Sequence, residues 1–259
     1  MLTVGMFGLG FLYFTGRETI FLIGAIVCLI SLIILSIIRN DKALFNEIIP
    51  EVLKSYDESL TYDHSKGISS GIYSSARFES YDRYHSEDLI TGKIHGCDFS
   101  MCEVHTENEH TDSDGDTHYV TLFHGTFALI NLKQDFGSWV NIVNNKIKVF
   151  SRDNYISLEN TEFEDIYDVF TGDKIKAMRL LTPDVTTKMI DLYNQTGIYC
   201  EIKISGKNMY IRLYTRSLFN LSFSNIEKEA KKIGMCMAII DSVFKITGNF
   251  INELERLDD

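Results

Sequence analysis

The side chains with metal-binding or acid–base chemistry gather in one stretch of the sequence. All seven histidines fall within His64–His124. Cys97 and Cys102 lie between His95 and His105, and both residue types are ligands that zinc accepts. Structural zinc sites usually show close pairs such as C-x₂-C, which this stretch lacks. In an extended strand residue 102 also faces away from residues 95, 97 and 105. The spacing therefore argues against a zinc site.

Acidic side chains cluster in the same stretch. Residues 103–116 hold six acids and no Lys or Arg. Asp112, Asp114 and Asp116 resemble the start of a calcium loop, but Thr117 stands where an EF-hand needs Gly and Phe123 where it needs Glu. Two interpretations stay open: a solvated hairpin tip, or a surface that attracts a cation or a basic partner.

These patterns define candidate residues. We expect no bound metal and no cofactor. The side chains that come nearest to a metal site are His105, His110, Asp112 and Asp114. The candidate interaction surface consists of Glu107, Glu109, Asp112 and Asp114.

A second polar block, residues 81–88, mixes acids, a base and phenols. Asp82, Arg83 and Asp88 are its candidate catalytic residues, since such a set can hold a polar ligand or act as a general acid/base pair. The same block can instead form a buried ion network that positions the first strand. The chain contains no phosphate-binding glycine loop, nucleophile elbow, H-E-x-x-H or Rossmann fingerprint, which counts against the common enzyme classes.

The element that must position these residues is a long hairpin. Strand-like runs over 93–110 and 117–132 flank a turn at Asp114-Gly115-Asp116, and Asp-Gly is a strong turn signal. A common core face is expected for Cys97, Phe99, Met101, Phe123, Phe127 and Leu129.

The rest of the chain predicts an α+β fold. Short strands are expected at 147–150 and 155–158, and Thr182-Pro183 starts a helix that Gly197 ends. Alternation over 198–213, with a turn at Ser205-Gly206, predicts a second hairpin. A capping box at Ser224–Glu227 begins a long C-terminal helix, whose apolar stripe favours packing on the sheet over a coiled coil.

An N-terminal segment predicts a membrane anchor. Ile20–Ile38 is an uncharged apolar run of the length that a bilayer core requires, and it shows no polar face. Residues 2–14 are also apolar but too short to span a bilayer core as one helix. They form the thin first leg of a helical hairpin, lie at the membrane interface, or belong to a span that starts upstream, and we favour the hairpin. Arg39 and Lys42 follow the long span, so the positive-inside rule places the following domain in the cytoplasm.

Charge and cysteine content agree with that arrangement. We expect residues 1–40 to be the anchor and residues 41–259 to be one cytoplasmic domain at the inner membrane. The chain has 25 Lys and Arg residues and 36 Asp and Glu residues. Residues 1–40 hold two of the bases and one of the acids, so residues 41–259 carry 23 bases and 35 acids. This balance excludes nucleic acid as the main partner, because a polyanion needs clustered Lys and Arg. Five cysteines without framework spacing suit a reducing compartment.

Three blocks carry a family resemblance. They are residues 48–56, the segment from Ser80 to Gly125, and the segment from Leu158 to Pro183. Together they resemble the bacterial family called domain of unknown function 3137. The resemblance implies one or two N-terminal spans before a single domain, and it brings no activity or cofactor. This chain departs from the pattern in its short first apolar segment.

The leading hypothesis is a membrane-tethered binding module. It would contact the lipid bilayer through its span and bind a protein partner, with another membrane protein as one candidate. The alternative is a metal-assisted hydrolase or transferase that uses the acidic and His-rich region 81–124.

Overall fold

The computed structural model describes residues 49–55, 57–146, 153–218 and 226–257, with side chains of the last range described from residue 231 onward. The predicted span Ile20–Ile38, the apolar segment 2–14, the strand at 147–150 and the cap at Ser224 lie outside these residues. The two termini of the described chain belong to helices, since residues 49–55 are helical and the C-terminal helix ends at Glu255.

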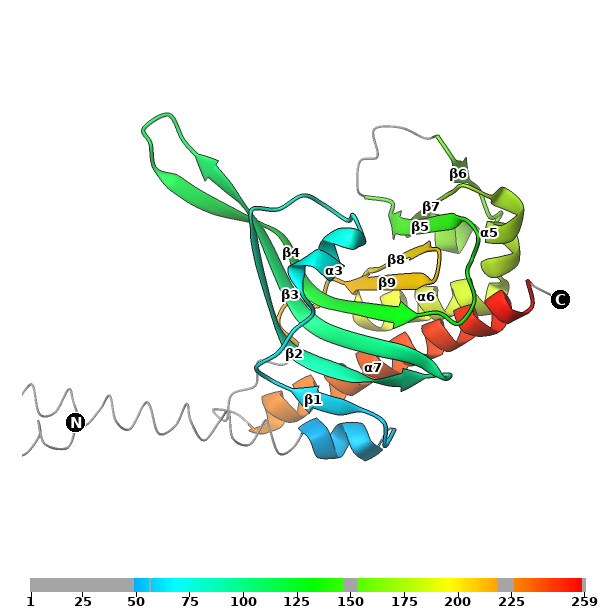
Figure 1. Cartoon of the computed structure of the whole chain (residues 1–259), viewed down its shortest axis with the longest axis horizontal. Helices are drawn as coiled ribbons and strands as arrows, with labels where there is room; N and C mark the ends of the chain where they lie inside the picture. Colours follow the sequence, from blue (N-terminus) through cyan, green and yellow to red (C-terminus); the bar gives the residue numbers. More distant parts are fainter. Residues whose placement is uncertain (1–48, 56, 147–152, 219–225, 258–259) are drawn as a thin grey trace, which may run out of the picture.

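A nine-stranded antiparallel sheet forms the centre of the α+β fold (Figure 1). The strand order is β1-β2-β3-β4-β9-β8-β5-β7-β6. The strands are β1 Thr61–Asp63, β2 Arg83–Ile94, β3 Cys97–Thr111, β4 Thr117–Asn131, β5 Trp139–Asn144, β6 Tyr155–Ile156, β7 Tyr167–Thr171, β8 Cys200–Ser205 and β9 Asn208–Leu213. The predicted α+β fold is therefore confirmed, and the predicted hairpins belong to one large antiparallel sheet.

The long hairpin is part of a three-stranded meander. The predicted strand over 93–110 begins at Cys97, because Lys93 and Ile94 belong to the preceding strand β2. His95 and Gly96 form the connecting turn, both with positive φ (48° and 75°), which is the backbone of a two-residue hairpin turn. Because β2 begins at Arg83, most of the polar block at 81–88 lies in this strand.

Both faces of the sheet are buried. Phe99 and Met101 pack in the larger core with Ile130, whereas Phe123 and Phe127 pack in a second core with Cys102. The expectation of one common core face was wrong. The register of β3 and β4 explains the error, because directly paired residues point to the same face of the sheet. Met101 pairs with Ala128 and Cys102 pairs with Phe127. Phe127 therefore shares the face of Cys102, which is opposite to that of Met101.

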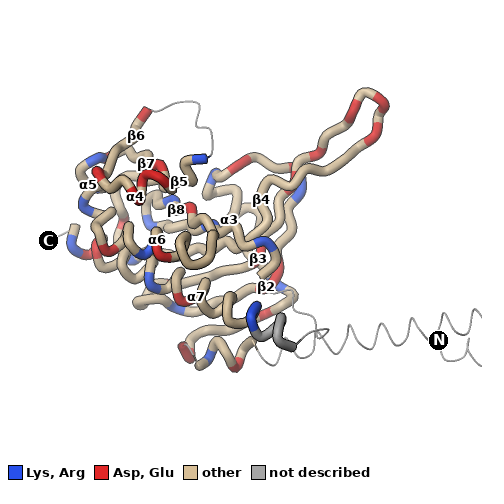
Figure 2. The backbone as a smooth tube through the Cα atoms, turned by 180° about the vertical axis from the view of Figure 1, so that it is seen from behind, with Lys and Arg blue, Asp and Glu red and all other residues tan. Residues whose placement is uncertain are grey.

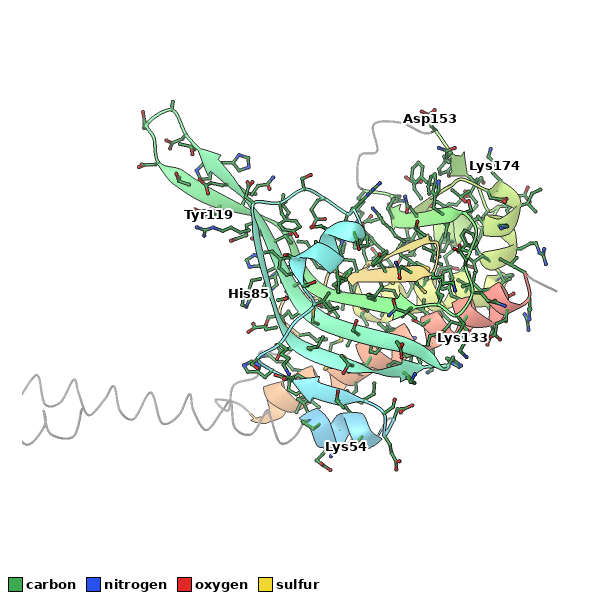
Figure 3. The ribbon with its side chains drawn as sticks, viewed as in Figure 1. Lys54, His85, Tyr119, Lys133, Asp153 and Lys174 are labelled. Atoms are coloured by element: carbon green, nitrogen blue, oxygen red, sulfur yellow. The ribbon has the colours of Figure 1, made fainter. Side chains whose placement is uncertain are left out.

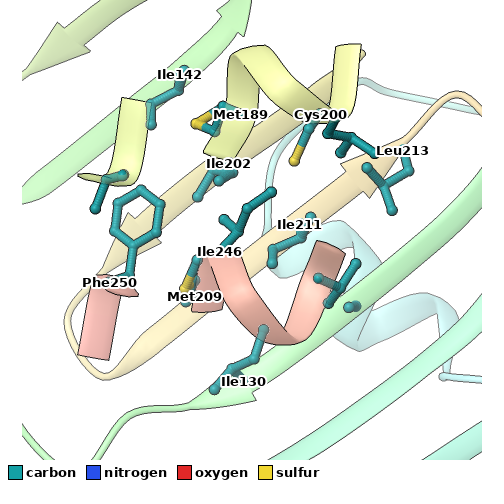
Figure 4. Packing of buried hydrophobic residues seen from close by; sticks show 14 of the residues in the cluster. Ile130, Ile142, Met189, Cys200, Ile202, Met209, Ile211, Leu213, Ile246 and Phe250 are labelled. Carbon is teal, nitrogen blue, oxygen red and sulfur yellow. The ribbon is translucent and has the colours of Figure 1, made fainter. Parts of the chain in front are cut away.

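Helices cover the two faces unequally. The larger core lies under α6 (Pro183–Thr196) and α7 (Ile226–Glu255), and Figure 4 shows Met189 of α6 and Ile246 of α7 among the strand residues. The smaller core lies under α3 (Ser70–Ser75) alone. Two short helices, α4 (Thr161–Glu164) and α5 (Lys174–Leu180), begin with caps at Asn160 and Asp173.

The predicted ends of α6 are confirmed, although the Thr182 side chain at its N-cap makes no capping hydrogen bond. Pro183 occupies the first turn of α6, and Gly197 ends the helix in the left-handed conformation with φ 70°. The apolar stripe of α7 packs on the sheet as expected, since Ile240, Ile251 and Leu254 are buried in the larger core.

By length and composition, Lys231–Glu255 of α7 would also suffice to cross a bilayer, which is weak evidence of membrane association. This segment is the core helix of the described part of the chain, and core helices pass the same test. Val243, Ile246 and Phe250 are fully buried against the sheet and α6.

Candidate functional site

The hairpin of β3 and β4 continues beyond the sheet as a two-stranded arm, residues 107–122 (Figure 1). Pairing with β2 ends at Glu107, and pairing with β9 extends only to Thr126 of β4. The arm begins at a bulge, where Leu122 is the additional residue between the pairs Thr106–Phe123 and Glu107–Thr121. Beyond Glu109 of β3 and Thr121 of β4, neither strand of the arm has another neighbour among the described strands, so both edges are open toward the tip.

The arm combines acids with exposed apolar side chains. Tyr119, Val120 and Leu122 are 37%, 44% and 37% exposed. Figure 2 shows acidic residues along the arm and around its tip. The arm can therefore make apolar contacts with a partner and can also attract a partner that is positively charged.

The tip is built around Asp112. Its Oδ1 accepts hydrogen bonds from the backbone N–H groups of Asp114 and Asp116, each at 3.0 Å. Asp112 is therefore the residue that forms the turn, and Asp114 is exposed beside it. Of the predicted interaction residues, Asp112 has a structural role and Asp114 is available for contact.

Two of the predicted catalytic residues brace the base of the arm. Asp82 Oδ2 accepts a hydrogen bond from Glu109 N at 2.8 Å. The guanidinium of Arg83 lies 3.4 Å from the ring centroid of Tyr119, which is a cation–π contact. Figure 3 shows Tyr119 on the arm and His85 below it on β2. Asp82 and Arg83 thus connect β2 to the arm.

Asp88 lies elsewhere in β2. It is six residues from Asp82, or roughly 20 Å at about 3.3 Å per strand residue. Asp88 sits in a bulge with φ 61° and is 3% exposed. Its Oδ1 is 2.5 Å from Tyr62 Oη and 2.6 Å from His64 Nδ1. The structure therefore places Asp88 in a buried network that joins β2 to β1, apart from Asp82 and Arg83.

Three histidines lie in register across three strands. His85 pairs with His105, and His105 pairs with His124, whose ring stacks on it at 4.7 Å between centroids. Burial, and then the neighbouring His124, lower the pKa of His105. His124 Nε2 lies 3.2 Å from Glu103 Oε1. Within the described residues no three His, Cys, Asp or Glu side chains are grouped as metal ligands.

The other side chains that were considered as metal ligands do not come together with His105 either. His110 stacks on His118 at 5.8 Å on the arm, and it faces opposite to His105 by strand alternation. Cys97 and Cys102 occupy the two different cores, as their spacing predicted.

Sequence analysis missed a charge network centred on Arg212, beneath α3. Arg212 Nη2 lies 2.7 Å from Glu201 Oε2 and 2.7 Å from Tyr214 Oη. Arg212 Nη1 pairs with Glu79, which precedes β2. Glu201 is 1% exposed and Arg212 is 6% exposed. Although burial alone would lower the pKa of Arg212, Glu201 and the other acidic partners raise it above its ordinary value.

Aromatic rings enclose the guanidinium. It lies 4.4 Å from the ring centroid of Phe78 and 4.7 Å from that of Phe123. On the neighbouring strand, Lys203 Nζ lies 4.6 Å from the same Phe78 ring. Burial, and then the charge of Arg212, lower the pKa of Lys203 to about 8.

A signal for this network existed in the sequence. The predicted turn at Ser205-Gly206 fixes the register of the second hairpin, and that register pairs Glu201 with Arg212. Opposite charges at directly paired positions predict an ion pair. Its burial depends on α3, which the sequence analysis did not predict.

Comparisons with known proteins give a family and a distant structural likeness. No curated protein matches the chain. The crystal structure of the mycobacterial trehalose monomycolate transport factor A, TtfA, covers 78% of this chain and 96% of its own, at 9% identity and a TM-score of 0.40. We draw no conclusion from a likeness at that level. Residues 121–245 match the family model described as "Protein of unknown function (DUF3137)", which confirms the resemblance seen in the sequence.

Proposed function

We propose that this protein is a membrane-tethered binding module whose arm engages a basic protein partner at the cytoplasmic face of the inner membrane. The observation that carries the proposal is the projection of the arm beyond the sheet with Tyr119, Val120 and Leu122 exposed.

The energetics of the arm support a role in binding. A two-stranded hairpin in water is only marginally stable, because it buries little apolar surface. In this chain Asp82 and Arg83 brace the arm through a hydrogen bond and a cation–π contact. Open edges and exposed apolar side chains are also an aggregation liability. A partner that pairs with an edge or covers the apolar side chains would offset both costs.

The charge of the arm indicates the chemistry of the partner. Residues 107–122 contain Glu107, Glu109, Asp112, Asp114 and Asp116 and no Lys or Arg. Such a surface repels acidic proteins and attracts Lys- or Arg-rich segments. Another membrane protein with a basic cytoplasmic segment fits these requirements.

A photocrosslinking experiment tests the proposal. A photoreactive residue is placed at Val120 of the full chain in its native membrane, and a matched control carries it at Ile175 of α5, which is 74% exposed. We expect a discrete crosslinked species from position 120 and none from position 175. Neutralising the arm with Glu107→Gln and Asp114→Asn should reduce the yield several-fold, because rim charges act mainly on association.

The control for charge removes two exposed acids outside the arm, Glu58→Gln and Glu159→Gln, and should leave the yield unchanged. The proposal fails if position 120 gives no discrete species, or if the species persists unaltered in the neutralised arm.

The orientation needs a separate test. The four cysteines that the structure describes are all buried, so they do not report accessibility. An Asp114→Cys variant places a thiol at the exposed tip. A maleimide that cannot cross the membrane should label this variant only after permeabilisation. Labelling in intact cells would place the domain on the outer face.

A further inference from the structure

A pocket lies beside α3 on the sheet face that α6 and α7 leave free. It has a volume of about 560 Å³, within the range of roughly 300–1,000 Å³ that small ligands occupy. Its floor is formed by β5, β8 and β9, and its wall by the end of α3 and Arg77. Alternation explains the floor, because Val140, Ile202 and Ile211 face the larger core and their neighbours in each strand face the pocket side.

The charged residues in the lining are both cations. Arg77 and Lys203 line the pocket, and none of its described lining residues is acidic. This is unusual for a chain with a formal net charge of −11. Neither cation forms an ion pair with a described side chain, so both charges remain available to an anion.

The backbone of residue 77 contacts the ammonium group of Lys203. Arg77 has φ 51°, a left-handed conformation that non-glycine residues rarely adopt. In this conformation its carbonyl oxygen accepts a hydrogen bond of 2.6 Å from Lys203 Nζ. The sharp turn after α3 therefore brings residue 77 onto the ammonium group of Lys203.

Uncharged donors line the remainder of the pocket. The side-chain amides of Asn141 and Asn208 and the indole N–H of Trp139 have no hydrogen-bond partner among the residues that the structure describes. Gly172 makes room for the indole, since a Cβ at residue 172 would come within 2.7 Å of Trp139 Nε1. The pocket thus combines two cations, two amides and two aromatic side chains, those of Trp139 and Tyr210.

We propose that this pocket binds a small organic phosphate, with the phosphate group between Arg77 and Lys203 and its uncharged polar body over Trp139 and the two asparagines. Arginine matches phosphate oxygens with two parallel N–H donors, and lysine contributes a point charge. The ligand's source is either a soluble phosphate ester or the headgroup of an anionic phospholipid, which share this chemistry.

The only tryptophan of the chain, Trp139, makes binding measurable, because its fluorescence reports directly on the pocket. The full-length protein in detergent micelles is titrated with glycerol 3-phosphate, with inorganic phosphate, and with glycerol as an uncharged control. In a second arm the protein is titrated with vesicles of phosphatidylglycerol and of phosphatidylcholine. We expect a saturable change with a phosphate-bearing probe and none with glycerol or phosphatidylcholine.

Two variants test the cations separately. Lys203→Met keeps the apolar stem and removes the charge, and Arg77→Asn removes the guanidinium at a φ that Asn tolerates. Each should weaken phosphate binding at least tenfold. The matched control is Lys245→Met on α7, which removes the same charge at a 60% exposed site on the other side of the sheet and should bind like the parent. An unchanged circular dichroism spectrum confirms that each variant is folded.

A response to glycerol 3-phosphate that both pocket variants lose supports the proposal with a soluble ligand. A response to phosphatidylglycerol alone, lost in the same variants, supports it with a lipid headgroup. The proposal is overturned if no phosphate-bearing probe gives a saturable response, or if folded Lys203→Met binds like the parent. The arm is not part of the pocket, so either result leaves the proposed binding function to its own test.

Discussion

Glu201 and Arg212 lie directly opposite each other on β8 and β9 and form a buried ion pair, with 2.7 Å between Glu201 Oε2 and Arg212 Nη2. The other carboxylate oxygen, Glu201 Oε1, is buried and accepts no hydrogen bond from a described residue. A buried pair of this kind adds little net stability, but removal of one partner leaves the other charge buried and unpaired.

Arg212→Met should therefore lower the free energy of unfolding by about 3–5 kcal/mol. The double variant Glu201→Met with Arg212→Met should recover part of this loss, because it removes the orphaned carboxylate. Urea unfolding followed by circular dichroism measures both values. The matched control Arg256→Met, at a 70% exposed side chain, should cost under about 1 kcal/mol. A loss below 1 kcal/mol in Arg212→Met would show that Glu201 is not desolvated.

Lys203→Met should stabilise the domain at pH 7. Burial and the charge of Arg212 lower the pKa of Lys203 from its ordinary 10.5 to about 8, while Glu201 and Glu79 oppose this shift. Below pH 8 Lys203 is charged in both states, and water solvates this charge better in the unfolded chain than the folded protein does. The charge therefore lowers the free energy of unfolding of the parent, and Lys203→Met removes this effect. A gain of about 1 kcal/mol raises the Tm by roughly 2–4 °C for a domain of this size.

The advantage of Lys203→Met should disappear with rising pH. Between about pH 8 and pH 10.5 the unfolded state binds more protons than the folded state, so the parent gains stability over this window relative to the variant. Melting curves of the two proteins at pH 7 and pH 10 measure the change. A difference in Tm that is constant across the window would contradict the assigned burial of Lys203.

Asp88→Ala should destabilise the edge of the sheet at β1. The substitution removes the acceptor for Tyr62 and His64 and leaves Ala at φ 61°. An unsatisfied buried partner costs about 1–3 kcal/mol, and the left-handed backbone adds to it. Asp88→Asn keeps an acceptor oxygen and tolerates the backbone, so it should cost less. Thermal unfolding and amide exchange in β1 measure both effects, and equal losses in the two variants would rule out the acceptor role.

Asp112→Ala and Asp114→Ala should differ although both remove one charge from the tip. Asp112 holds the turn through two backbone N–H groups, whereas the exposed Asp114 has no such contact. Amide exchange in the arm should become several-fold faster in Asp112→Ala and stay at the parent rate in Asp114→Ala. Equal exchange rates in the two variants would show that the turn does not depend on the Asp112 carboxylate.

Local signals in the sequence were sufficient for several elements. The turn at Ser205-Gly206 and the flanking alternation predicted β8 and β9, and Thr182-Pro183 with Gly197 predicted α6. Asp114-Gly115 placed the tip of the arm, although Asp112 supplies its hydrogen bonds. Each of these signals acts within a few residues of the backbone that it shapes.

The sequence by itself determined the order of most elements, the family resemblance, the acidic composition of the arm and the apolar run at 20–38. Only the tertiary structure decided which strand faces are buried. α3 covers one face and α6 and α7 cover the other, so Phe123 and Met101 enter separate cores and Arg212 becomes enclosed. Alternation along a strand separates its two faces but does not reveal what packs on each. Burial, and with it the charge network and the pocket, follows from contacts between segments far apart in the chain, such as Phe78 on Arg212.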